Sequence, residues 1–294
     1  LIRMGRHGNS HEGRKVVNGN QPATRSPFLF FLLVFLLSVP FLLLLFLGER
    51  FLPEMPANLP ITAPMVLIPM AAALILVYRE GGRQGVKALL KRALDYRKIE
   101  PIWLLLIFLL LPLIMVLSYV WLSLAGNAIP DPEVPILLVP VYLFLFAIAG
   151  TGEELGWQGY AFDPLEERWN ALGAAIVVGV VWQLWHLLPD VQAQQAPGWI
   201  FWQRVSSVAL RVLIVWVYNN TGKSVFAAIA LHAVSNAGVY LFPNYGSHYD
   251  PFTTGVLIII AAAVVVFLWG PRTLARFRFA REGRSRFPDR SVRQ

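Results

Sequence analysis

Long runs of apolar residues without charged side chains dominate the hydrophobic pattern of this chain. The first extends from Pro27 to Gly48 and contains 22 residues, and about 20 apolar residues are enough for a helix to cross a bilayer. The pattern therefore predicts an all-α fold, a polytopic membrane bundle of about eight transmembrane helices. The other predicted spans cover residues 60–78, 101–125, 134–160, 171–188, 199–218, 224–241 and 253–270.

The amino-acid composition favours a membrane over water as the surroundings of this fold. Only 14% of the 294 residues are charged and 56% are hydrophobic, whereas an average soluble domain is about 25% charged. The absence of cysteine excludes a disulfide framework and any zinc or iron–sulfur site held by cysteines. We therefore assign residues 27–270 to one bundle in contact with membrane lipids, in a multi-pass protein of the cell membrane.

Lysine and arginine are unevenly distributed around the predicted spans. Of the 25 in total, five precede the first span, seven lie between the second and third spans, and eight follow the last. With eight spans these clusters share one side of the membrane with Arg168 and Lys223, while the opposite loops hold Arg50 and Arg204. The positive-inside rule makes the clustered side cytoplasmic, so both termini are predicted to be cytoplasmic. The division of the basic residues among tails and a loop argues against a nucleic-acid partner.

Three segments outside the spans complete the predicted organisation. Residues 1–26 form a basic, polar tail that is expected to be disordered, and residues 271–294 form an Arg-rich cytoplasmic tail. Residues 79–100 form a cytoplasmic loop with an apolar helical face beside basic residues. That loop fits either an amphipathic helix on the inner leaflet or an ordinary solvated helix.

Two glutamates, Glu153 and Glu154, are the acidic residues that fall inside a predicted span. A charge at such a depth costs about 2.5–3.5 kcal/mol on insertion scales, so it persists where it acts or is paired. Neighbouring residues differ by about 100° around a helix, so both carboxylates can face one cavity, and Glu154 shares a face with Gln158. Close carboxylates repel and a low dielectric disfavours ionisation, so the pKa of one carboxyl is expected to rise, which suits a general acid or base near neutral pH.

Further polar residues interrupt the fifth, sixth and seventh spans, namely His186, Arg211, and His232 with Asn236. His232 and Asn236 are one turn apart, so they can converge on one point to stabilise an oxyanion, or a histidine there can bind a metal. At about 1.5 Å per residue, these side chains and Glu153 lie roughly 10–20 Å from the predicted cytoplasmic ends of their helices. The helices are therefore predicted to bring their polar groups together in one slab of the membrane.

In chain order these motifs resemble the signature of the CPBP family, the CAAX proteases and bacteriocin-processing intramembrane proteases that are also called Abi proteins. The resemblance covers about residues 134–240. It implies the hydrolysis of a peptide bond within the membrane. The matching residues are Glu153, Glu154, His186, His232 and Asn236.

Two positions depart from the family pattern. Gln158 stands where the family usually has Arg, and Trp182 stands where it usually has Phe. The first departure removes a cation next to the glutamates. We hypothesise that Arg211 supplies the missing charge from the sixth span, as a partner of one of the glutamates.

The resemblance also implies a role for each matching residue. Glu153 would activate water, with His186 holding the water or sharing its proton, while His232 and Asn236 would stabilise the oxyanion and Glu154 would orient the site. In a second version His186, His232 and a glutamate such as Glu153 hold Zn²⁺ or another divalent metal, which lowers the pKa of bound water to about 7. These residues are compatible with a glutamate protease and with a metalloendopeptidase, and they do not decide between the two. A site open to the cytoplasm would suit a prenylated CAAX tail, a peptide precursor or a membrane anchor as the peptide or protein substrate.

Two other functions compete with the peptidase hypothesis. In a proton-coupled transporter, Glu153, Glu154 and Arg211 would form a relay, but the polar groups gather at one depth and no inverted repeat is evident. In a non-catalytic immunity or scaffold protein of the same fold, the site would be vestigial, and Gln158 is the best argument for that alternative. We favour the intramembrane endopeptidase.

Overall fold

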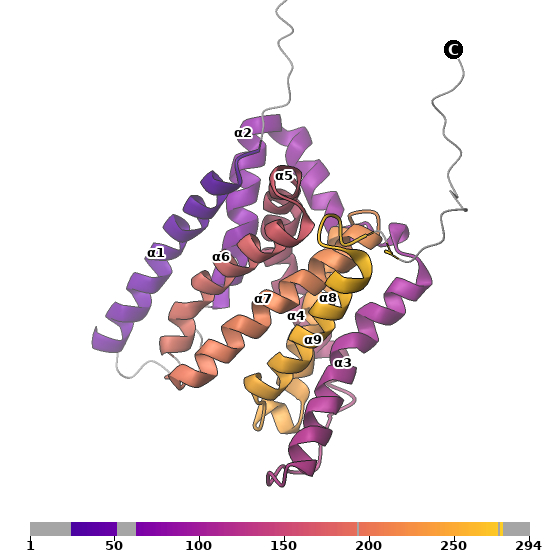
Figure 1. Cartoon of the computed structure of the whole chain (residues 1–294). Helices are drawn as coiled ribbons and strands as arrows, with labels where there is room; N and C mark the ends of the chain where they lie inside the picture. The colour runs from indigo at the N-terminus through magenta and orange to yellow at the C-terminus, as the bar shows by residue number, and fades with distance from the viewer. Residues whose placement is uncertain (1–24, 52–62, 193, 276, 279–294) are drawn as a thin grey trace, which may run out of the picture.

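The computed structural model describes residues 25–51, 63–192, 194–275 and 277–278, which form a bundle of long helices (Figure 1). No strand occurs among these residues, so the all-α prediction is confirmed. Short helical turns, η1 to η5 and α5, connect some of the long helices. The long helices are α1 (Pro27–Phe51), α2 (Ile68–Lys91), α3 (Pro101–Leu124), α4 (Val139–Gly156), α6 (Ala171–Gln192), α7 (Pro197–Asn220), α8 (Val225–Leu241) and α9 (Pro251–Trp269).

Each predicted span corresponds to one of these helices. Seven of the described helices are long and apolar enough to cross a membrane. The remaining one, α8, has 17 residues and is also apolar. It packs against α3, α4 and α7 and is buried along most of its length. Neighbouring helices rather than lipid therefore surround α8, which places its polar side chains within protein.

The fourth span continues beyond its predicted end. The helix α4 is followed by a π-helical turn, η4 (Trp157–Phe162), and then by α5 (Asp163–Arg168), so that one candidate span covers Val139–Arg168. Glu153 consequently lies near the middle of this span rather than near its end. A π turn shifts the helical register, so side chains after Gly156 do not continue the face that carries Glu153.

Two glycines allow α4 to lie directly against η1 (Ala63–Leu67) and α2. A Cβ atom added to Gly156 would lie 2.5 Å from the carbonyl oxygen of Pro69, and one added to Gly152 would overlap the carbonyl oxygen of Val66. Small residues at four-residue spacing permit such close helix packing in membranes. The glycines flank Glu153 and thus fix its helix against α2.

Gly156→Ala is expected to lower the stability of the protein by about 1–3 kcal/mol, because the new methyl group must displace backbone rather than a flexible side chain. The displacement of α4 should also lower any activity that depends on Glu153. Thermal unfolding in detergent measures the first effect. Gly198→Ala in α7 is the matched control, since no atom lies within 4 Å of its added Cβ. Equal stability of the two variants would contradict the close packing of α2 and α4.

The segment predicted as a cytoplasmic loop is largely helical. Helix α2 continues to Lys91, with a bend at Gly82, whose φ of 57° is left-handed. Leu89 is buried and lies next to Gly159, whereas Leu94 is exposed. Part of the apolar face therefore packs on the protein itself. The position of this helical segment relative to a membrane surface stays a prediction.

Connections from both halves of the chain meet at the end of the bundle that holds the bend of α2 and α5 (Figure 1). The side chain of Arg92 donates a hydrogen bond to the carbonyl of Gly159, at 2.7 Å. Lys223 pairs with Asp163 and Glu166, at 2.9 Å to each. Partial burial lowers the pKa of Lys223, but its hydrogen bonds to the two carboxylates outweigh burial and raise the pKa overall. Ion pairs thus tie together this end of the bundle, which carries many of the lysines and arginines and is called the basic end below.

Most of the two predicted tails lies outside the described residues. Of residues 271–294 the structure describes 271–275 and 277–278, and Leu274 there is buried against the bundle, so the predicted C-terminal tail begins as a packed segment. The cytoplasmic location of both termini is not addressed by the helix arrangement and stays a prediction.

Candidate active site

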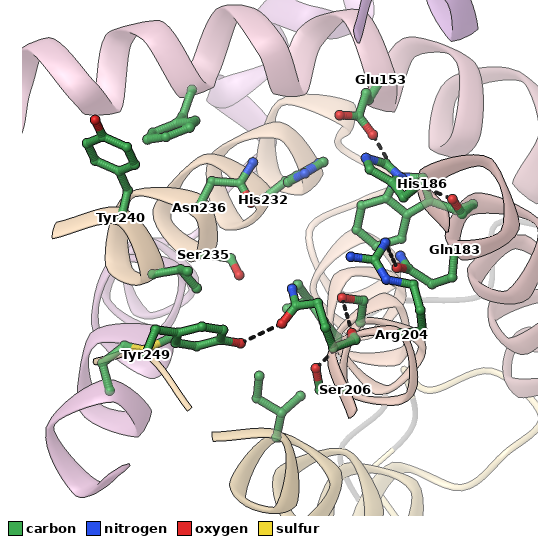
Figure 2. A pocket seen from close by; sticks show the side chains of 18 residues that line it. Glu153, Gln183, His186, Arg204, Ser206, His232, Ser235, Asn236, Tyr240 and Tyr249 are labelled. Atoms are coloured by element: carbon green, nitrogen blue, oxygen red, sulfur yellow. Dashed lines mark hydrogen bonds between the residues drawn. The ribbon is translucent and has the colours of Figure 1, made fainter. Parts of the chain in front are cut away.

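A cavity of about 290 Å³ lies between α4, α6, α7 and α8 and collects most of the predicted polar residues (Figure 2). Helix α4 contributes Glu153, α6 contributes His186, and α8 contributes His232 and Asn236. These residues are 83 positions apart at most in the sequence yet border one space. The predicted meeting of polar groups from separate spans is therefore present in the structure.

Glu153 is held by the indole of Trp182. Its side chain is 3% exposed, and Oε2 accepts a hydrogen bond of 2.6 Å from Trp182 Nε1. Phe, which the family usually has at the position of Trp182, has no polar hydrogen to donate. The exchange is therefore more than a change of aromatic ring, because it adds a charge-assisted hydrogen bond to the carboxylate.

His186 is oriented by its own helix. Its Nδ1 lies 3.0 Å from the carbonyl oxygen of Trp182, one turn earlier. A carbonyl only accepts hydrogen bonds, so Nδ1 carries the proton and Nε2 carries the lone pair. The rings of Trp182 and Trp185 flank the imidazole edge-on, at 5.4 and 4.7 Å between centroids. The ring is thus fixed with Nε2 as its basic atom.

Glu154 lies behind the cavity wall rather than on it. It is fully buried, and its two oxygens engage different helices. Oε1 lies 2.8 Å from His232 Nδ1, and Oε2 accepts a hydrogen bond of 2.6 Å from Arg211 Nη1. The expectation that both glutamates face one cavity is therefore wrong. The hypothesis that Arg211 pairs with one of the glutamates is confirmed by the ion pair.

Arg211 itself is fully buried and also covers the face of Trp182, with its guanidinium carbon 4.3 Å from the ring centroid. Arg211 therefore connects the two side chains that hold Glu153 and His232 in place, Trp182 and Glu154. A buried charge is tolerated only when it is paired and hydrogen-bonded, and Glu154 provides that pairing.

Gln158 does not join this arrangement. It is fully buried in the π turn, and neither its amide nitrogen nor its amide oxygen has a hydrogen-bond partner among the described residues. It does not line the cavity. The face that it was expected to share with Glu154 is disrupted by the π register.

Sequence analysis missed a second polar group at the cavity, centred on Arg204. Arg204 donates to Gln183 Oε1 at 2.6 Å and pairs with Asp190 at 2.8 Å, while Tyr249 donates to Gln203 Oε1 at 2.9 Å. Arg204 was assigned to a loop, and Asp190 lies beyond the predicted end of the fifth span at residue 188. In the structure α6 continues to Gln192 and includes Asp190, and Arg204 lies within α7. The sequence signal that could have revealed this pair is an arginine and an aspartate, of opposite charge, near the adjoining ends of two predicted spans.

The second version of the mechanism requires a metal held by His186, His232 and a glutamate such as Glu153. Within the described part of the chain, no three His, Cys, Asp or Glu side chains are grouped closely enough to hold a metal ion. The carboxylate of Glu153 is engaged by Trp182, and Nδ1 of His232 by Glu154. His186, His232 and Glu153 as placed therefore do not fit a three-ligand metal centre.

Comparisons with known proteins point to the same segment of the chain. The family model of the type II CAAX prenyl endopeptidase Rce1-like proteins matches residues 135–238. The chain is 29% identical over 222 residues to CAAX prenyl protease 2 of Methanococcus maripaludis, across 70% of this chain and 81% of that protein. It is also 24% identical over 215 residues to Lysostaphin resistance protein A of Staphylococcus haemolyticus, across 69% of this chain and 55% of that protein. The matched segment includes Glu153, His186, His232 and Asn236.

Proposed function

Because this chain belongs to the CPBP family of CAAX-type proteases, we propose that it is an intramembrane endopeptidase of the cell membrane. Its substrate is a membrane-associated peptide or protein, of which a prenylated CAAX-like tail is one example. The observation that carries the proposal is the shared cavity of Glu153, His186, His232 and Asn236. A carboxylate, two imidazoles and an amide around one cavity are the groups that peptide hydrolysis needs.

The first step in the proposed mechanism is the activation of water by Glu153. The carboxylate takes a proton from a water molecule as the water oxygen attacks the carbonyl carbon of the scissile peptide bond. Nε2 of His186 accepts a hydrogen bond from that water and orients it. The hydrogen bond from Trp182 fixes the carboxylate, so that little reorganisation is needed when the water attacks.

His232 and Asn236 stabilise the negative charge that develops on the carbonyl oxygen. The amide nitrogen of Asn236 donates one hydrogen bond to the oxyanion. Glu154 provides a counter-ion at Nδ1 of His232, so a protonated imidazole can present Nε2–H as the second donor. The C–N bond then breaks, and the proton held by Glu153 passes to the leaving amine. Glu154 and Arg211 are positioning residues because they act through His232 and Trp182.

The proposal is tested with purified protein in detergent and a quenched fluorescent peptide that ends in a farnesylated Cys-a-a-X sequence. The wild type should cleave it, and Asn236→Ala should lower kcat by about 10²–10³-fold because one oxyanion donor is lost, with a smaller effect on KM. Asn127→Ala, which replaces an exposed amide that does not line the cavity, is the matched control. Cleavage products are identified by mass spectrometry.

One result would count against the proposed mechanism, and another against the peptidase function itself. Equal rates for Asn236→Ala and the wild type would remove Asn236 from the mechanism. If neither the farnesylated peptide nor its unprenylated counterpart is cleaved by folded wild type, the non-catalytic immunity or scaffold role becomes the better explanation. The unpartnered amide of Gln158 favours that alternative.

A further inference from the structure

Arg204 is the only lysine or arginine among the described residues that line the active-site cavity. It lies in the first half of α7, and Figure 2 shows its side chain beside Gln183, on the side of the cavity that carries His186. The proposed mechanism gives Arg204 no role. A permanently charged side chain inside a membrane bundle is expected either to act or to be paired, so its pairing decides between these two possibilities.

The pairing of Arg204 within the protein is incomplete. Its Nη1 donates a hydrogen bond of 2.6 Å to Oε1 of Gln183, and its Nη2 lies 2.8 Å from Oδ2 of Asp190. Nevertheless, Nε of Arg204 and Oδ2 of Asp190 are both buried without a hydrogen-bond partner among the described residues. The contact with Asp190 is therefore an ion pair in which the N–H groups are not aligned with the carboxylate. A guanidinium has five N–H donors, so donors remain for a ligand.

The remaining donors of Arg204 are suited to a carboxylate. A guanidinium can bind both oxygens of a carboxylate through two parallel hydrogen bonds. A carboxylate that enters the cavity would be repelled by Glu153, which lines the same space. The neighbourhood of Arg204 is thus where a negatively charged group of a ligand would be most stable.

The position of Arg204 limits which part of a peptide can reach it. Trp182, which holds Glu153, and Asp190 are eight residues apart on α6, or about 12 Å at 1.5 Å per residue. The guanidinium contacts Gln183 and Asp190 within this interval. Since an extended peptide spans at most about 3.3–3.6 Å per residue, a carboxylate bound by Arg204 would lie a few residues from the scissile bond.

From this incompletely paired guanidinium in the cavity, and on the basis of the proposed peptidase function, we infer that Arg204 is a specificity residue. It binds a carboxylate of the substrate that lies a few residues from the scissile bond. The α-carboxylate at the end of a short C-terminal tail and the carboxylate of an acidic side chain share this chemistry. Gln183 and Asp190 hold the guanidinium in place for the contact.

Peptide binding tests this inference without requiring cleavage. Fluorescently labelled, farnesylated Cys-a-a-X peptides with a free C-terminal carboxylate or a carboxamide are titrated with solubilised protein that carries Glu153→Gln, which prevents turnover. The acid should bind about 10–100-fold more tightly than the amide, as expected for hydrogen bonds between charged groups. Addition of Arg204→Gln should abolish this preference without weakening the binding of the amide. Equal affinity for the acid and the amide before Arg204 is replaced would overturn the inference.

Further variants separate recognition from packing. Arg204→Lys keeps the charge but lacks the planar fork of the guanidinium, so its preference for the acid should lie between those of Arg and Gln. Lys223→Gln is the matched control, because Lys223 also pairs with acids but does not line the cavity. An equal loss of affinity for the acid and the amide in both Arg204 variants would show that Arg204 only ties α6 to α7, and would overturn the inference.

A third peptide distinguishes the two sources of the carboxylate. It ends in a glutamate whose α-carboxyl group is converted to the amide, so that its terminal carboxylate is on a side chain. If it binds as tightly as the free acid, Arg204 accepts an acidic side chain. If it binds as weakly as the uncharged amide, Arg204 recognises the end of the chain.

Cleavage kinetics separate this inference from the peptidase function. With Glu153 intact, Arg204→Gln should raise KM for the free acid about 10–100-fold and change kcat little, since the contact exists already in the bound substrate. A fall in kcat with KM unchanged would overturn the role in recognition. No cleavage by the folded wild type would count against the peptidase function, and the binding titrations would still decide whether Arg204 binds a carboxylate.

Discussion

Replacement of Glu153 by Gln should lower kcat for the reporter peptide by about 10²–10⁴-fold, the usual contribution of a general base. The amide cannot take a proton from water. Its oxygen can still accept the hydrogen bond from Trp182 that the carboxylate accepts at 2.6 Å, so the fold should persist. KM should change little, since the loss lies in the chemical step.

The matched control for this prediction is Glu167→Gln, which neutralises an exposed acid at the basic end. Cleavage rates are compared at equal amounts of folded protein, with thermal unfolding as the measure of folding. If Glu153→Gln retains more than a tenth of the wild-type kcat, Glu153 is not the base. If the protein is instead a proton-coupled transporter, Glu153→Gln should abolish proton flux in proteoliposomes, and the wild type should not cleave the peptide.

Removal of the charge of Arg211 should have the largest effect on stability. Arg211→Met leaves Glu154 buried with only His232 as its partner, and breaking a buried ion pair costs about 3–5 kcal/mol. Combining Arg211→Met with Glu154→Gln removes the uncompensated charge, while the new amide can still hydrogen-bond His232. The double variant should therefore regain much of the lost stability.

Denaturant titration in mild detergent measures these differences as a double-mutant cycle. Lys223→Met is the control, since partly exposed ion pairs contribute about 1 kcal/mol or less, and Lys223 is about half exposed. If Arg211→Met is as stable as the wild type, the ion pair does not hold the site together. The same conclusion follows if the double variant is no more stable than Arg211→Met.

The chemistry-bearing residues were predictable because each interrupts an apolar span. Glu153, His186, His232 and Asn236 stood out for that reason, and all four line the cavity. The pairing of Arg211 could be inferred because an unpaired cation in a span is costly. Arg204 and Asp190 were missed since both lie near predicted span ends, where a charge carries no comparable penalty.

Two features depended on register and could not be derived from spacing. Adjacent glutamates were expected to share the cavity, but the packing of α4 on α2 turns Glu153 towards the cavity and Glu154 towards Arg211 and His232. Gln158 was expected on the face of Glu154, and the π turn that begins at Trp157 removes it from that face. Such local changes of register arise from tertiary packing and leave no clear trace in a hydrophobic pattern.

The sequence by itself determined that this is a helical membrane bundle, because a run of some 20 apolar residues has few other stable environments. It also determined which side chains carry chemistry, since polar groups in such runs must act or be paired. The tertiary structure decided which glutamate faces the cavity and which partner holds each histidine. Those properties depend on how separate helices pack, and apolar residues specify burial without specifying the neighbour.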